Sequence, residues 1–96
     1  MTLPMRRDEA ETIALAALAW LASTDDLLGV FLGASGLSAD ELPRVAADPA
    51  TLVAVLDFLT QDDAWVMAFC DDRGLDYHAP LTARSVLAGP AGMHWT

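Results

Sequence analysis

The amino-acid sequence predicts an all-α fold, a small helical bundle of five to six helices. Segments rich in Ala and Leu have high helix propensity, and each is bounded by residues that begin or end helices. No segment shows the sustained apolar and polar alternation that indicates a strand. With 96 residues, 54% of them hydrophobic, we expect one domain over residues 1–96 whose core needs no metal or disulfide.

Residues that start and stop helices divide the chain into six segments. Side-chain oxygens of Ser, Thr and Asp accept hydrogen bonds from the free amides of a first helical turn. The expected N-terminal signals are Thr24, Asp25 and Asp26, the Ser38–Glu41 capping box, Asp48 before Pro49, and Asp62 with Asp63. These signals predict six helices: residues 5–23, a short helix that ends at Gly36, residues 38–47, residues 49–60, a helix that ends at Gly74, and a last helix between residues 78 and 88. Leu37 is expected to make the apolar contact that often follows a glycine at a helix end. Gly89–Pro90 is expected to end the last helix and leave residues 89–96 as a loose tail.

The run from Ile13 to Ala22 contains no polar residue. A helix that is apolar on every face is buried by several neighbours or makes an intermolecular contact. Ten residues are too few to cross a bilayer, which takes about 20. The acids that follow Arg6–Arg7 are also unlike a secretory signal. We therefore expect a cytoplasmic protein, and the single Cys70, which cannot form an internal disulfide, fits a reducing compartment.

The charge balance excludes several partners. Fourteen acidic residues face five arginines, a formal net charge of −9, so the chain repels phosphate backbones and anionic lipid surfaces. The segment from Gly36 to Arg44 resembles the turn and second helix of a helix-turn-helix. However, that second helix would present Asp40 and Glu41 to DNA. We expect no nucleic-acid partner and no membrane partner.

An internal similarity appears when the sequence is shifted by 38 residues, which aligns residues 12–37 with residues 50–75. Each copy reads as a long apolar helix, an acidic cap, a shorter helix with a central Phe, and a Gly-Leu stop. The identical pairs are Ala16/Ala54, Leu18/Leu56, Leu21/Leu59, Asp25/Asp63, Phe31/Phe69, Gly36/Gly74 and Leu37/Leu75. Two readings remain: two pseudo-repeated helical hairpins packed into one core, or matches that follow from the Ala- and Leu-rich composition.

These same segments carry a family resemblance. The run from Asp8 through Leu15 and on to Ala22, then Gly36-Leu37-Ser38, Asp48-Pro49, Val55 to Leu59, and Asp62-Asp63 resemble the bacterial family called domain of unknown function 3572. The resemblance covers roughly residues 7–87 and leaves out the end Met93-His94-Trp95-Thr96. It implies a small cytoplasmic α-helical protein. It implies no activity and supplies no catalytic residues.

The residues themselves indicate no catalytic, cofactor or metal site. Asp25–Asp26, Asp62–Asp63 and Asp71–Asp72 read as caps and solvated surface, because adjacent carboxylates on a helix point about 100° apart. Phosphate-binding glycine loops, nucleophile elbows and paired-histidine motifs are absent from the sequence. Cys70 and His78 are a formal nucleophilic pair, against the simpler reading of a buried Cys and an exposed turn His. His94 has no metal-site partner in the sequence.

Asp57 interrupts the most apolar helix and has two readings. It lies either on that helix's exposed stripe or against an arginine, with Arg84 and Arg44 as candidates.

For function, we expect a non-enzymatic interaction or regulatory module that presents an apolar patch, rimmed by acids, to a protein partner or to a second copy. An excess of large apolar residues, including Trp20, Trp65 and Trp95, motivates this reading. The alternative is a small-molecule-binding or enzymatic domain with an apolar cavity between the two hairpins.

Overall fold

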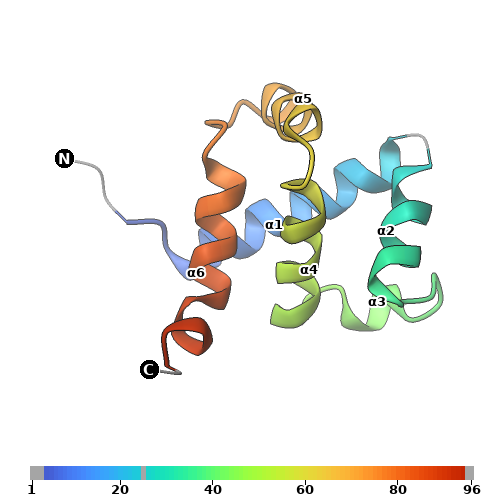
Figure 1. Cartoon of the computed structure of the whole chain (residues 1–96), viewed down its shortest axis with the longest axis horizontal. Coiled ribbons are helices and arrows are strands. Elements are labelled where there is room, and N and C mark those ends of the chain that lie inside the picture. The colour runs from blue at the N-terminus through green and yellow to red at the C-terminus, as the bar shows by residue number, and fades with distance from the viewer. Residues whose placement is uncertain (1–3, 25, 95–96) are drawn as a thin grey trace.

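The computed structural model describes residues 4–24 and 26–94, and side chains as far as Ala88. Within these residues the chain is all-α, as predicted, and no strand occurs. Figure 1 shows the order of the helices. They are α1 (Arg7–Ser23), α2 (Leu27–Ser35), α3 (Leu42–Val45), α4 (Pro49–Leu59), α5 (Asp63–Arg73) and α6 (Ala79–His94).

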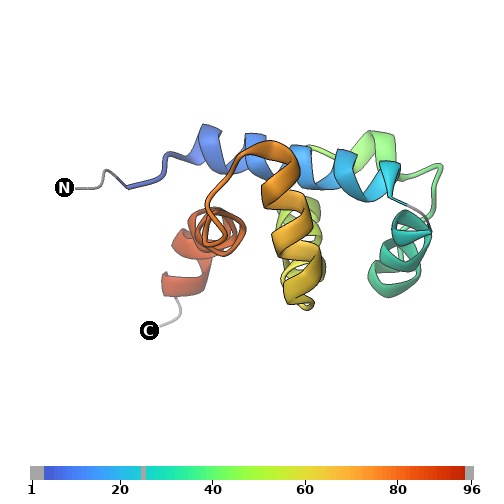
Figure 2. The same cartoon turned by 90° about the horizontal axis from the view of Figure 1, so that it is seen from above.

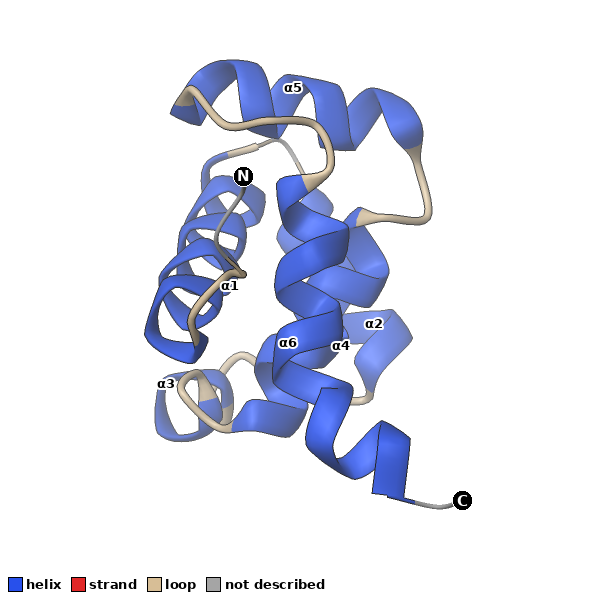
Figure 3. Ribbon diagram, turned by 90° about the vertical axis from the view of Figure 1, so that its left-hand side faces the viewer, coloured by secondary structure: helices blue, strands red, loops and turns tan. Residues whose placement is uncertain are grey.

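The longest helix, α1, crosses the three helices α6, α4 and α2, which stand beside one another along its length (Figures 1 and 2). α4 lies in the middle of this row and packs closely against α6, whereas its contact with α2 is smaller. α5 lies across one end of the row and the short α3 lies near the other end (Figure 3). Within the row, the contact between α2 and α4 is therefore the less extensive one.

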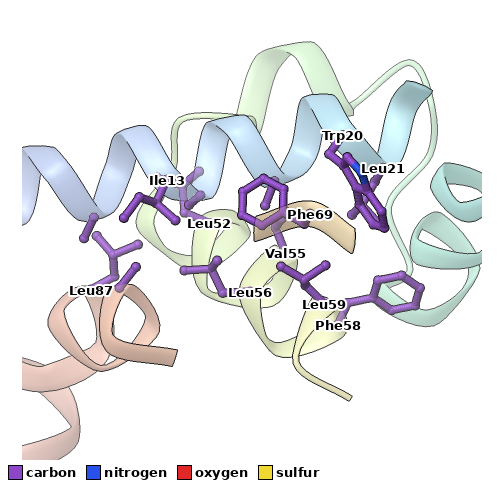
Figure 4. Close-up of a cluster of buried hydrophobic side chains, with 14 of the residues drawn as sticks. Ile13, Trp20, Leu21, Leu52, Val55, Leu56, Phe58, Leu59, Phe69 and Leu87 are labelled. Carbon is purple, nitrogen blue, oxygen red and sulfur yellow. The ribbon is translucent and has the colours of Figure 1, made fainter. Parts of the chain in front are cut away.

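The core fills the space between α1 and the row (Figure 4). α1 contributes the side chains that recur every three or four residues, which places them on one face of the helix. The buried apolar residues are Ala10, Ile13, Ala14, Ala17, Trp20, Leu21, Phe31, Leu52, Val55, Leu56, Phe58, Leu59, Phe69, Cys70, Ala83 and Leu87. Burial by several neighbours, one of the two expected explanations, accounts for most of the apolar run in α1, although Leu15 stays 42% exposed.

The predicted N-terminal caps are confirmed in part. Oδ1 of Asp62 accepts hydrogen bonds from the amides of Ala64 and Trp65, at 2.8 and 3.4 Å. The capping-box bonds also form, since Ser38 N donates to Glu41 Oε1 at 3.0 Å and Glu41 N donates to Ser38 Oγ at 3.2 Å. However, α3 begins only at Leu42 and ends at Val45, earlier than expected.

The expected start of α4 at Asp48-Pro49 is confirmed, but the expected side-chain caps of Asp48 and Asp26 do not form. Asp48 and Asp26 occupy the N-cap positions of α4 and α2, but neither side chain makes a capping hydrogen bond. Asp26 has φ 47°, in the left-handed region that aspartate tolerates better than most residues. Thr24 Oγ1 instead donates to Trp20 O, closing α1. The expected role of Asp25 lies outside the described residues.

The glycine stops of α2 and α5 are confirmed. Gly36 and Gly74 have φ of 80° and 68°, a conformation that costs other residues roughly 1 kcal/mol or more. The amide of Gly36 donates to Leu32 O, and that of Gly74 donates to Cys70 O. Leu37 and Leu75, which follow the two glycines, are half-buried against the core, as the apolar contact after a C-cap predicts.

The expected stop at Gly89–Pro90 is wrong, because α6 continues to His94. Pro90 removes one backbone donor and favours a kink rather than a forced end, and the ribbon bends before its last turns (Figure 3). Ala88 and Ala91 on either side favour helix and support the continuation.

Equivalent positions of the two similar segments have similar surroundings. Leu21 and Leu59 are fully buried, as are Phe31 and Phe69 to within 1%. The two glycine caps share the left-handed conformation described above. The structure thus places two consecutive helix pairs, α1–α2 and α4–α5, at matching positions along the 38-residue offset.

No single helix in the described part of the chain is long and apolar enough to cross a membrane. Only α1 and α2 taken together meet that requirement of length and composition, and they are bent by 119° relative to one another.

Candidate binding surface

The helix α2 is rich in apolar residues but buries few of them. Its first eight residues, Leu27 to Ala34, include no polar side chain, yet Phe31 is the only buried residue of the helix. Leu27, Leu28 and Leu32 are half-buried, and Val30 is 52% exposed. A helix that is apolar on every face is normally enclosed by neighbours. Here the described chain covers one side of it.

The uncovered side of α2 carries small residues. At 100° per residue, Phe31 faces the core, and Gly29, Val30, Gly33 and Ala34 cover the opposite side and one flank, where all four are exposed. A Cβ atom built at either glycine meets nothing within 4 Å. Neither glycine has a positive φ. No turn, close contact or unusual backbone in the described fold therefore requires glycine at these two positions.

A hollow of about 190 Å³ opens between α2 and α4, on the side of α2 that carries Phe31 and Ala34. Its walls are mainly apolar, with polar groups at the edge. The lining residues are Phe31, Ala34, Ser35, Ala54, Asp57, Phe58 and Gln61. We name the exposed flank residues Val30 and Ala34 and this lining together the α2 surface.

Aromatic rings form the floor of the hollow and fix its shape. Phe58 lies at the edge of the core beside α2 (Figure 4). Its ring meets that of Phe31 edge-on, with centroids 5.6 Å apart, and stacks on Trp65 of α5 at 5.0 Å. Such pairs add about 0.5–1.5 kcal/mol beyond area burial. The floor of the α2 surface is therefore held by contacts to α4 and α5.

Asp57 pairs with an arginine of α6. Arg84 Nε donates to Asp57 Oδ1 at 2.5 Å, so the pairing hypothesis is confirmed with Arg84 rather than Arg44 as the partner. The reading of an exposed stripe is also partly right, because the two side chains keep 47% and 40% of their surface exposed. The hydrogen bond and charge of Asp57 raise the pKa of Arg84. The pair links α4 to α6 at the rim of the hollow.

The thiol and imidazole do not form a nucleophilic pair. Cys70 is buried and its Sγ donates to the carbonyl oxygen of Asp76 at 3.4 Å. Burial, and then the negative charges of Asp71 and Asp76, raise the pKa of this thiol, which opposes thiolate formation. His78 is exposed, and its Nδ1 lies 3.1 Å from Asp76 Oδ1. Cys70 is therefore a buried apolar residue and His78 an exposed residue of the turn.

The acidic pairs serve local structure. Asp72 contacts Arg73, Asp71 accepts a 2.7 Å hydrogen bond from Tyr77, and Asp62 caps α5. This bond from the phenol raises the pKa of Tyr77. Over the residues with described positions, no three His, Cys, Asp or Glu side chains gather as a metal would require.

A wider hollow of about 430 Å³ lies where α5 ends and α6 begins, with Glu9, Asp76 and His78 among its lining residues. The backbone amide of His78 donates to Asp76 Oδ1 at 2.7 Å, which lowers the pKa of Asp76. These polar groups organise the turn into α6. Both side chains are largely exposed, so the hollow lacks the enclosed polar groups that fix a ligand.

The sequence carries one signal of the uncovered side of α2. Gly29 and Gly33 are four residues apart in a helix with no charged residue, a spacing that places both on one face. Among the tryptophans singled out for a binding role, Trp20 is buried and Trp65 is half-buried. Trp95 and Asp25 lie outside the described residues.

Comparison with known proteins identifies the family of the chain. No curated protein and no solved structure matches the chain. The family model for "Protein of unknown function (DUF3572)" matches residues 7–90, which includes all of α1 to α5 and most of α6. The chain therefore belongs to the DUF3572 family.

Proposed function

We propose that this protein is a non-enzymatic interaction module that binds a protein partner through the α2 surface. The observation that carries the proposal is the apolar run Leu27 to Ala34 of α2, in which Phe31 alone is buried. Exposed apolar surface beside a hollow is a common property of protein-binding sites. In this proposal the protein acts in the cytoplasm, and its partner is neither a nucleic acid nor a membrane.

A partner of different sequence is favoured over a second copy. Two chains with a formal charge of −9 each repel one another, and the repulsion is greatest at low ionic strength. Self-association through the α2 surface would have to overcome this repulsion. A partner with fewer acids would not.

The competing function is binding of a small molecule between the two helix pairs, where the hollow lies. Its volume of about 190 Å³ is below the roughly 300–1,000 Å³ typical of ligand pockets. The described lining has one ionisable side chain, Asp57, and Arg84 already contacts it. The hollow thus fits one large side chain of a protein partner better than a whole metabolite.

Affinity capture from cells of the source species tests the proposal with a matched pair of variants. Val30→Glu places a charge on the α2 surface, and Leu81→Glu places the same charge on α6. The two positions are 52% and 56% exposed in the native protein. We expect the wild type and Leu81→Glu to capture the same protein and Val30→Glu to lose it. Equal capture by all three folded variants, or no captured protein, would overturn the proposal.

A further inference from the structure

The shape and lining of the hollow indicate what part of a partner would enter it. The rings of Phe31 and Phe58 and the methyl groups of Ala34 and Ala54 offer no hydrogen bonds to a polar group. A polar side chain placed there would lose its water contacts without replacement. The occupant therefore presents an apolar side chain to the hollow.

The secondary structure of the occupant follows from what surrounds the hollow. One mode of peptide binding adds an extended strand to a sheet edge, and the described fold contains no sheet. The exposed flank of α2 that carries Val30 and Ala34 borders the hollow, so a second helix can lie along it. A helix that lies along a groove can also place side chains from successive turns on the same partner.

The charge of the occupant follows from the one carboxylate that lines the hollow and from the net charge of the chain. The two helices that line the hollow, α2 and α4, contain no basic residue and one acid, Asp57. Arg84 contacts Asp57 through Oδ1, and the described contacts leave Oδ2 without a hydrogen bond. An additional donor can therefore reach this half-exposed carboxylate while Arg84 stays in place.

The arginines elsewhere do not offset the acidic surface. Each of four arginines contacts a neighbouring carboxylate in the described structure, in the pairs Arg6–Asp8, Arg7–Glu11, Arg73–Asp72 and Arg84–Asp57. The excess of nine formal negative charges remains and attracts a cationic segment from a distance. Complementary charge of this kind increases the association rate and the specificity.

We propose that the occupant is a basic amphipathic helix of a partner protein, which packs along the Val30 and Ala34 flank of α2, places an apolar side chain in the hollow over the touching rings of Phe31 and Phe58, and donates from Lys or Arg to Asp57. This inference rests on the proposed function and adds the chemistry of the partner to it. Binding weakens as salt is added, because the rim charges are exposed to solvent.

A displayed peptide library tests this chemistry directly. Every peptide carries Leu at positions i, i+3, i+4 and i+7 of a helical frame, and the remaining positions vary among Ala, Lys and Glu. Selection on the immobilised full chain is expected to enrich Lys, and amide chemical shifts of α2 and α4 should change when a selected peptide is added. Enrichment of Glu, absence of charge preference, or shift changes confined to other helices would overturn the inference.

Two substitutions at the ion pair separate a binding role from a structural one. Both Asp57→Asn and Arg84→Gln remove the same pair. We expect Asp57→Asn to weaken a selected Lys-rich peptide roughly fivefold, mainly through slower association, and Arg84→Gln to leave binding unchanged or tighten it. Equal weakening by both would mean that the pair acts through the fold and would refute direct recognition.

Failure here is distinguishable from failure of the proposed function. If the selected peptides lack basic residues but Val30→Glu still abolishes capture of the cellular partner, the interaction module stands and the basic helix is wrong. If Val30→Glu leaves that capture intact, the assignment of the α2 surface as the binding site is wrong.

Discussion

Replacing Gly29 or Gly33 by alanine is expected to stabilise the isolated protein. Both glycines lie inside α2, where alanine is about 1 kcal/mol more favourable than glycine. The added methyl group meets nothing within 4 Å, and neither φ is positive, so the substitution introduces no clash or strain. A gain of about 1 kcal/mol raises the Tm of a domain of this size by roughly 4–8 °C. The two gains should nearly add, because the two methyl groups share no partner.

Urea unfolding followed by far-UV circular dichroism measures this gain as a higher midpoint with an unchanged slope. Gly36→Ala is the matched control, because its φ of 80° strains any other residue and alanine there should cost roughly 1–2 kcal/mol. A lower midpoint for Gly29→Ala or Gly33→Ala would show that the space above α2 is not free and would refute the reasoning. The stabilised variants should bind a selected peptide as tightly as the wild type, because both glycines lie on the side of α2 opposite Phe31 and the hollow.

Three further predictions concern the ends of helices, the buried thiol and the ion pair. Asp62→Ala should lower the free energy of unfolding by about 1 kcal/mol, whereas Asp48→Ala should change it much less, because only the first side chain caps its helix; equal losses in urea unfolding would contradict this. Because burial raises the folded-state pKa of Cys70, its contribution to stability is present below the unfolded thiol pKa of about 8.5 and is lost as pH rises further. Cys70→Ala should therefore flatten the alkaline decline of the urea midpoint, and parallel curves for the two proteins would contradict the assignment. A double-mutant cycle on Asp57 and Arg84 should give a coupling of at most about 1 kcal/mol that falls with added salt, since both side chains are partly exposed; a salt-independent coupling of several kcal/mol would show that the pair is desolvated.

Helix type and most helix boundaries were predictable because local signals agreed with the packing. The apolar spacing in α1, the glycine stops at Gly36 and Gly74, and the Asp62 cap each act within a few residues and need no distant partner. The end of α6 was not predictable by the same rule. A Gly-Pro pair ends many helices, but a single missing donor can also be accommodated by a bend.

The binding surface was harder to predict than the fold. The hollow exists because α2 contacts α4 only loosely. This loose contact depends on how α1 and α3 position α2 in the fold, and no sequence motif marks it. The pairing of Asp57 was foreseeable as a choice between Arg84 and Arg44, but the choice depends on α6 packing beside α4. Composition exposed the excess of apolar residues without showing which helix would carry it.

The contact between α1 and α6 has a consequence for how the molecule is made. Because these helices are far apart in sequence, their pairing closes a long loop, and this closure carries an entropic cost before its contacts form. During synthesis α1 leaves the ribosome before α6, and until α6 has been made much of the apolar face of α1 stays uncovered. A chaperone that shields short apolar helices is therefore expected to bind the nascent chain between the appearance of α1 and the arrival of α6.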